Sequence, residues 1–139
     1  MNNLITFPSD KKIYFASDNH LGAPTFEESL PRERKFVSWL DHVKKDAAAI
    51  FLVGDLFDFF FDYKTVVPKG FTRVLGKLAE ITDLGVPVYF FVGNHDLWMN
   101  DYFEKELNIK TFHRPQYFLL NNTDLSLYQK SVVIYIYYP

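Results

Sequence analysis

The sequence predicts an α/β fold in which strands and helices alternate in the order βαβαβα. Three short apolar runs, Ile13–Ala16, Ile50–Val53 and Val88–Val92, have the length and residue types of buried parallel strands. The segments between them carry apolar residues at helical spacing. Together these patterns indicate β-sheet layers flanked by helices.

The first helix is expected at about Pro31–Lys45. Ser29 is a suitable capping residue for this helix, and proline is favoured in a first helical turn. An apolar stripe recurs at helical spacing and should face the sheet; it consists of Phe36, Leu40 and Val43.

The second and third helices are expected at about Phe71–Asp83 and Asn100–Leu107. Gly85 and Pro87 separate the second helix from the strand that follows it. The inward-facing stripe of the second helix is expected to consist of Val74, Leu75, Leu78 and Ile81.

Length and charge restrict the classes of protein to which the chain can belong. Its 139 residues are enough for one domain with a core. With 15 basic and 17 acidic residues, the net charge of −2 argues against a nucleic-acid partner. The chain has no cysteine, which excludes a disulfide scaffold. Because no apolar run reaches the ~18 residues of a membrane span and no signal-peptide pattern is present, we expect a cytoplasmic protein.

A polar cluster follows each of the three predicted strands. These clusters are Asp18-Asn19-His20, Gly54-Asp55-Leu56-Phe57-Asp58 and Gly93-Asn94-His95-Asp96. Because sites in open α/β sheets form at the carboxyl ends of the strands, we expect the three clusters to meet at one edge. Each motif alone is weak, since Gly-Asp and Gly-Asn are common in turns, but three in succession indicate a site.

The residue types at this edge suit a pair of divalent cations that share a ligand. Asp18, His20, Asp55 and Asn94 are the candidate ligands, with Asp55 bridging the two ions. Such a mixed shell without thiolates suits Mn²⁺, Fe²⁺ or Zn²⁺ better than Ca²⁺, and Mn²⁺ is preferred here. Asp58 is placed to accept a ring N–H of His95, which would fix the tautomer and leave a proton for a leaving oxygen. His95 and Asp58 are therefore the candidate catalytic residues.

Two other histidines are expected to lie outside this site. His42 is in the first predicted helix and should face solvent, whereas His113 precedes Arg114-Pro115 in a connection.

The three motifs resemble the D-x-H, G-D-x-x-D and G-N-H-[DE] pattern of the calcineurin-like metallophosphoesterases, in the same order. The longer sequence segments around Gly54–Phe59 and Gly93–Met99 are similar to those of the UDP-2,3-diacylglucosamine hydrolases of the Bacteroides type, and the resemblance covers about residues 11–121. This resemblance implies cleavage of the pyrophosphate of a nucleotide-linked glycolipid to lipid X and UMP, in lipid A biosynthesis. His95 stands where the best-studied branch has arginine, and another phosphodiester is the alternative substrate.

The resemblance also implies later ligands, from a Gly-His segment and a His-x-His pair. No glycine follows Gly93, and His113 is the only histidine after His95. The second metal site is therefore expected to be incomplete, and the alternative function is a truncated, inactive remnant.

The tail gives a reason for the missing ligands. Residues 1–123 match the N-terminal part of such a domain, whereas the Tyr/Ile-rich residues 124–139 are interpreted as a frameshifted or aberrant tail. A true edge strand over Val132–Tyr138 is the alternative.

Aromatic residues crowd the segments that follow Asp55 and Asn94, in particular Phe57–Phe61, Tyr63, Trp98, Tyr102 and Phe103. We expect about half of them to pack into the domain. The others could form an apolar lip for acyl chains or for peripheral contact with the inner membrane.

Overall fold

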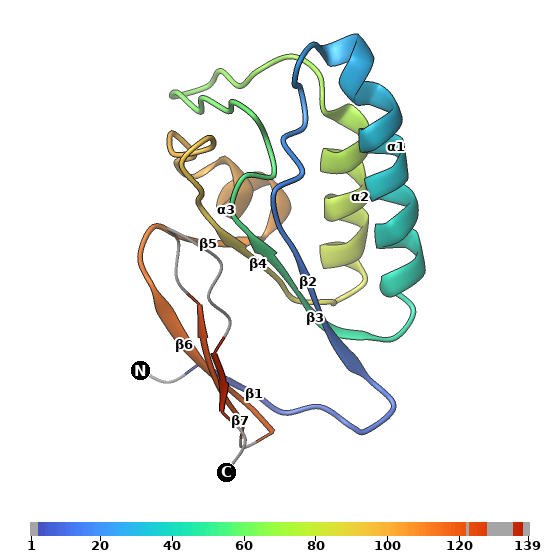
Figure 1. Ribbon diagram of the computed structural model, residues 1–139, viewed down its shortest axis with the longest axis vertical. Coiled ribbons are helices and arrows are strands. Elements are labelled where there is room, and N and C mark those ends of the chain that lie inside the picture. The colour runs from blue at the N-terminus through green and yellow to red at the C-terminus, as the bar shows by residue number, and fades with distance from the viewer. Residues whose placement is uncertain (1–2, 122, 128–134, 138–139) are drawn as a thin grey trace.

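The computed structural model describes residues 3–121, 123–127 and 135–137, which form two sheets (Figure 1). The first sheet is entirely parallel and has the order β2-β3-β4-β5. Its strands are β2 (Lys12–Ala16), β3 (Ala47–Val53), β4 (Val88–Phe91) and β5 (Lys110–Phe112). The three strands expected from the apolar runs are thus neighbours in one sheet.

The second sheet has the order β1-β6-β7-β8 and is mixed. Its strands are β1 (Asn3–Ile5), β6 (Gln116–Leu120), β7 (Thr123–Leu127) and β8 (Tyr135–Tyr137). β1 runs parallel to β6, with Leu4 opposite Leu119, and β6, β7 and β8 pair antiparallel. Of the edge strand over 132–138, which was the alternative interpretation of the tail, only β8 is among the described residues. The interpretation of residues 124–139 as an aberrant tail stays a prediction.

The first helix begins earlier than expected. α1 spans Phe26–Val43, and Thr25 is its N-cap, accepting a hydrogen bond from the Glu28 N–H at 3.2 Å. The expected start near Pro31 was wrong because the Thr25-x-x-Glu28 capping box precedes it. Pro31 lies inside the helix on its exposed side, where water can serve the backbone carbonyl left without a partner.

The other two helices are capped by residues distant in the sequence. α2 spans Thr72–Asp83, and its Val74 N–H donates to the buried Glu33 carboxylate of α1 at 3.1 Å. α3 spans Tyr102–Leu107, and the buried Asp62 carboxylate accepts hydrogen bonds from the Asn100 and Tyr102 N–H groups. Carboxylates are favourable at helix N-termini because they satisfy free N–H groups and oppose the helix dipole.

Two hydrophobic cores cover the two faces of the parallel sheet. The helices bury their apolar stripes against one face, where Leu40, Leu78 and Phe103 are fully buried. The second sheet packs on the other face, around Phe51 and Phe118. Both faces of β3 are therefore buried, which explains its continuous apolar sequence.

The predicted fold class, β-sheet layers flanked by helices, is confirmed. Over the described residues, we find no helix with the length and apolar character required to cross a membrane.

Candidate metal and catalytic site

The three polar clusters meet at the carboxyl ends of β2, β3 and β4. Backbone hydrogen bonds hold the loops together: the Asp18 N–H donates to the Gly54 carbonyl at 3.2 Å, and the His20 N–H donates to the Asp55 carbonyl at 2.9 Å. The His95 N–H donates to Asp55 Oδ1 at 3.0 Å. Asp55 therefore lies between the other two loops.

The backbone at this edge adopts an unusual conformation. Asp18, His20 and Asp55 have φ angles of 56°, 44° and 52°, in the left-handed region that residues with a side chain rarely occupy. Such strain persists only where surrounding contacts hold it, and it is concentrated at functional sites. The three residues with this strained backbone are among the four that the sequence pattern predicts to be metal ligands.

Asp18, His20 and Asp55 form a group that could hold one cation. One ligand atom from each lies within 4.8 Å of the others. The Nε2 atom of His20 lies 3.8 Å from Asp18 Oδ1 and 3.9 Å from Asp55 Oδ2. Ligands at bond lengths of ~2.1 Å around a tetrahedral ion are about 3.4 Å apart, so each of these two distances exceeds that spacing by a few tenths of an ångström. Two carboxylates and one imidazole suit Mn²⁺, Fe²⁺ or Zn²⁺.

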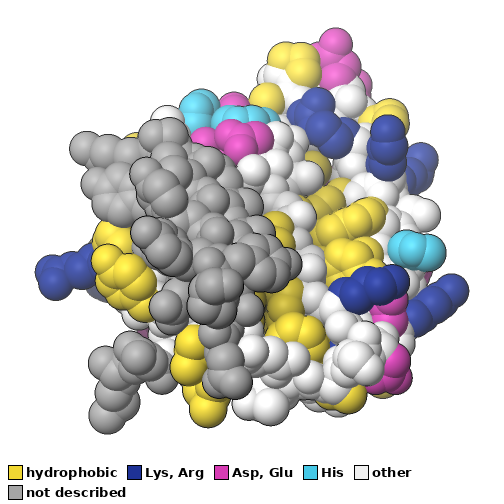
Figure 2. All heavy atoms as spheres, turned by 60° about the horizontal axis from the view of Figure 1, so that its bottom comes forward, with side chains coloured by type: hydrophobic (Ala, Val, Ile, Leu, Met, Phe, Trp, Pro, Cys, Tyr) yellow, Lys and Arg dark blue, Asp and Glu magenta, His cyan; other side chains and the backbone are white. Residues whose placement is uncertain are grey.

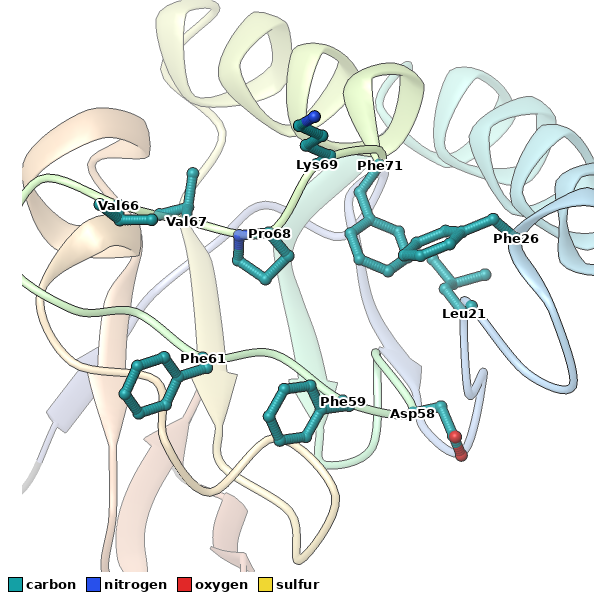
Figure 3. A pocket seen from close by; sticks show the side chains of 11 residues that line it. Leu21, Phe26, Asp58, Phe59, Phe61, Val66, Val67, Pro68, Lys69 and Phe71 are labelled. Carbon is teal, nitrogen blue, oxygen red and sulfur yellow. The ribbon is translucent and has the colours of Figure 1, made fainter.

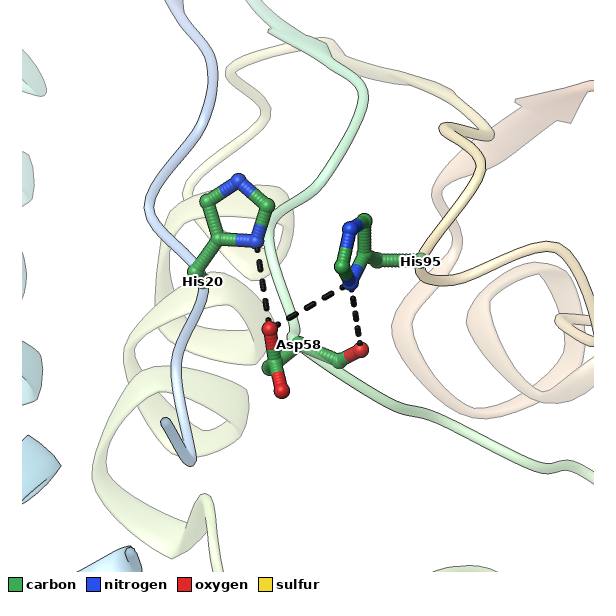
Figure 4. A group of neighbouring side chains, drawn as sticks. All are labelled: His20, Asp58 and His95. Atoms are coloured by element: carbon green, nitrogen blue, oxygen red, sulfur yellow. Dashed lines mark hydrogen bonds and ion pairs between the residues drawn. The ribbon is translucent and has the colours of Figure 1, made fainter. Parts of the chain in front are cut away.

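Asp58 lies between the two histidines of the site (Figure 4). Its Oδ1 atom is 3.4 Å from His20 Nδ1 and 3.3 Å from His95 Nδ1, and the Asp58 carbonyl oxygen is 3.1 Å from His95 Nδ1. The two rings meet edge to face with centroids 4.7 Å apart. When Nδ1 of His20 faces a carboxylate in this way, Nε2 is left for the ion, as in carboxylate–histidine–metal arrangements.

The sequence analysis predicted that Asp58 lies close to His95, but it did not predict that Asp58 also lies close to His20. The contact with His20 was missed because Asp58 and His20 belong to loops after different strands, and the residue spacing within one motif does not predict their distance.

Asn94 is exposed and lies between Gly93 and His95, directly after the strand end. Its assignment as a ligand stays a prediction.

The two histidines expected outside the site are exposed: His42 lies on α1, and His113 lies in the connection between β5 and β6. Figure 2 shows histidine and acidic side chains together at one edge of the molecular surface, where solvent reaches them.

Asp96, the last residue of the Gly-Asn-His-Asp motif, was given no role from the sequence. This buried carboxylate accepts hydrogen bonds from the Gly93 N–H at 2.6 Å, the Leu56 N–H at 2.9 Å and the Phe57 N–H at 3.4 Å. Burial raises the pKa of Asp96 to about 6 and the Asp55 charge adds to this rise, whereas the three N–H donors oppose it. Asp96 thus joins the loop after β4 to the loop after β3. Its position at the end of the Gly-Asn-His-Asp motif was the available signal.

The aromatic residues near the site divide into a buried and an exposed group, apart from Tyr102, which is half-buried. Phe57, Phe60 and Phe103 are fully buried, as expected for about half of the set. The exposed group consists of Phe59, Phe61, Tyr63 and Trp98. Phe59 and Trp98 come from the two loops that flank the site, and their ring centroids lie 5.6 Å apart.

A pocket of about 470 Å³ adjoins the site and is lined mainly by apolar side chains (Figure 3). Asp58, Phe59 and Phe61 line it along one segment, and Val66 to Lys69 line it along another. Asp58 is thus shared between this pocket and the two histidines.

Comparison with known proteins agrees with this geometry. Residues 11–137 match the family of calcineurin-like phosphoesterases. A UDP-2,3-diacylglucosamine hydrolase of Porphyromonas gingivalis is 51% identical over 96 residues, which cover 69% of this chain and 37% of the relative. The protein of the same name from Actinobacillus succinogenes is 31% identical over 107 residues, covering 76% of this chain and 42% of the relative.

A third relative, the UDP-2,3-diacylglucosamine hydrolase of Haemophilus influenzae, is 29% identical over 127 residues, covering 89% of this chain and 47% of the relative. The chain spans less than half the length of these relatives. Its matched motifs and its strand-end carboxylates and histidines show that the chain belongs to the calcineurin-like phosphoesterase family.

Proposed function

We propose that the protein is a metal-dependent hydrolase of phosphate esters or pyrophosphates, with UDP-2,3-diacylglucosamine as its substrate. The observation that supports this most is the convergence of Asp18, His20 and Asp55 on one point, with the Asp58–His95 pair beside it. The names of the relatives support the choice of substrate.

The proposed ligands for the first ion are His20 Nε2, Asp18 Oδ1 and Asp55 Oδ2. Asn94 is the proposed ligand for the second ion, which shares Asp55. Divalent cations at such a site, Mn²⁺ by preference, polarise phosphoryl oxygens and activate water. During hydrolysis a water oxygen bonds to phosphorus and the bridging P–O bond breaks, so the sugar phosphate leaves.

His95 is proposed to supply the proton to the leaving oxygen. Its Nδ1 faces the carbonyl oxygen and Oδ1 of Asp58, so Nε2 is the ring atom directed away from that residue and available to substrate. Asp58 keeps the ring in this orientation and also faces His20. Loss of Asp58 is therefore expected to affect both the metal group and the proton donor.

The apolar pocket supports a lipid-linked substrate. Phe59 and Phe61 are exposed to 56% and 43%, and exposed apolar side chains beside a polar site usually mark a contact surface. An acyl group in the pocket would lie next to Asp58, adjoining the phosphoryl chemistry. We propose that the same exposed aromatic residues make peripheral contact with the inner membrane from the cytoplasm.

The 139-residue chain is proposed to hydrolyse its substrate slowly by itself. The second ion has only Asp55 and Asn94 as proposed ligands, and the only later histidine, His113, is exposed in the connection between β5 and β6. Two ligands hold an ion weakly and leave its charge poorly oriented for transition-state stabilisation.

Calorimetric titration with Mn²⁺ tests the proposed site. We expect His20→Ala to weaken the binding of the first ion strongly. The matched control is His42→Ala, at an exposed position of α1, and it should bind Mn²⁺ as the wild type does. His95→Ala should leave this binding unchanged and lower the residual hydrolysis of UDP-2,3-diacylglucosamine by roughly 10²–10⁴-fold. Equal Mn²⁺ binding by the wild type and by His20→Ala would contradict the proposal.

A further inference from the structure

The loop that carries His20 is held from outside by the first turns of α1. The buried Ser29 hydroxyl accepts a hydrogen bond from the Gly22 N–H at 2.7 Å. Arg32 Nη2 donates to the His20 carbonyl at 2.9 Å and also to the Ala23 carbonyl. The sequence pattern does not predict these contacts. Arg32 is an exposed helix residue, and such a charge is usually interpreted as solvated surface charge.

We propose that Arg32 is a positioning residue for His20, which it holds in the conformation that directs Nε2 to the metal group. The proposal rests on the metal site of the proposed function.

The backbone of His20 needs such support. Its φ of 44° lies in the left-handed region, which is unfavourable for a residue with a side chain. The His20 N–H is held by the Asp55 carbonyl, and the His20 carbonyl is held by the Ala23 N–H at 3.2 Å and by Arg32. Among the described residues, Arg32 is the only one whose side chain donates a hydrogen bond to the His20 backbone.

The guanidinium group suits this role better than an ammonium group. It is planar, is charged at all physiological pH values and presents several N–H donors in a fixed geometry. One Arg32 nitrogen serves two carbonyls, those of His20 and Ala23, and so closes the turn between them. A lysine keeps the charge but lacks this geometry.

The consequence for the metal group follows from side-chain direction. The Cα–Cβ bond moves with the backbone, so relaxation of φ at His20 would turn the imidazole away from its present position. Nε2 lies 3.8 Å from Asp18 Oδ1 and 3.9 Å from Asp55 Oδ2, already longer than the ligand spacing around a tetrahedral ion, so a further displacement would take Nε2 out of reach of the ion. The same movement would also separate the His20 and His95 rings, whose centroids are 4.7 Å apart.

The test compares Arg32→Gln and Arg32→Lys with the control Arg34→Gln. Arg34 is exposed on the same helix, so the control removes the same charge two residues away. For each protein, three quantities are measured: the Mn²⁺ dissociation constant by calorimetry, the urea midpoint of unfolding, and the nuclear Overhauser contact between the two imidazole rings without metal.

We expect Arg32→Gln to weaken Mn²⁺ binding by roughly 10–100-fold, as is usual for residues that orient a metal ligand, and to lose the ring contact. Arg32→Lys should remain several-fold weaker than the wild type, and Arg34→Gln should match the wild type. Wild-type Mn²⁺ affinity and an intact ring contact in Arg32→Gln would overturn the inference. A lowered urea midpoint with both readouts unchanged would also overturn it, because Arg32 would then be only structural.

The failure of this inference and that of the proposed function give different results. If the wild type fails to bind Mn²⁺, the proposed function is wrong, and the ring contact without metal still decides whether Arg32 positions His20. If the wild type binds Mn²⁺ and the Arg32 variants bind it equally well, the metal site stands and the role of Arg32 does not.

Discussion

Gly93→Ala is predicted to damage the site and the fold through one methyl group. A Cβ atom at Gly93 would lie 2.1 Å from Asp55 Oδ1, 2.4 Å from the Asp55 backbone nitrogen and 2.8 Å from Asp55 Cγ. Real Cβ atoms essentially never approach closer than 3.0 Å, so the Asp55 backbone and carboxylate must both move by several tenths of an ångström or more. Because the Asp55 nitrogen is part of the backbone, rotation of a side chain cannot relieve the clash.

Overpacking of this kind costs typically 1–3 kcal/mol, and we expect about 3 kcal/mol because backbone is displaced. For a domain of this size that corresponds to a melting temperature lowered by roughly 10 °C. Displacement of Asp55 should also weaken Mn²⁺ binding at least roughly tenfold, since Asp55 is a proposed ligand.

The matched control is Gly76→Ala, at an exposed position of α2, where a Cβ atom meets nothing within 4 Å. This substitution should raise the free energy of unfolding by about 0.5–1 kcal/mol, because alanine is more favourable than glycine in a helix interior. Thermal unfolding followed by circular dichroism measures both variants, and calorimetry measures their Mn²⁺ binding. A Gly93→Ala protein that melts at or above the wild-type temperature with full Mn²⁺ affinity would show that the close approach of Gly93 to Asp55 is not required.

Two further predictions concern carboxylates. Asp96→Asn should lower the urea unfolding free energy by roughly 1–3 kcal/mol, because its amide N–H₂ would face backbone N–H donors that now bind oxygen; unchanged stability would contradict this. The salt-bridge network of Asp41 and Glu80 with Lys44 and Lys77 should stabilise α1 against α2 above about pH 4, and this contribution should fade as pH falls toward 2. The sign follows because hydrogen bonds from Lys44 and Lys77 lower the pKa of Asp41 to about 2 from its usual 3.8, so the unfolded chain binds the proton first. Urea midpoints at several pH values should therefore fall less steeply with acid in Asp41→Asn than in the wild type, and equal slopes would contradict the prediction.

Local sequence patterns predicted the parallel sheet well but placed helix starts less accurately. The continuous apolar run within β3 can only be satisfied by burial on both faces, so its type was readable from composition. The start of α1 was misplaced because Ser29 and Pro31 are plausible start signals that compete with Thr25. The caps of α2 and α3 come from Glu33 and Asp62, and no local pattern shows a cap supplied from 38–41 residues away.

The residues at the strand ends could be identified from local sequence, because the Asp-x-His, Gly-Asp-x-x-Asp and Gly-Asn-His-Asp clusters directly follow apolar runs. The second sheet could not be predicted in this way, because β1 and β6 pair across more than a hundred residues of chain. Three further contacts also emerge only from the folded chain: Asp58 faces both histidines, Asp96 joins two loops, and Arg32 holds the His20 carbonyl. These contacts join segments whose separation in space is set by strand order and helix packing, and a periodic pattern in one segment carries no information about that distance.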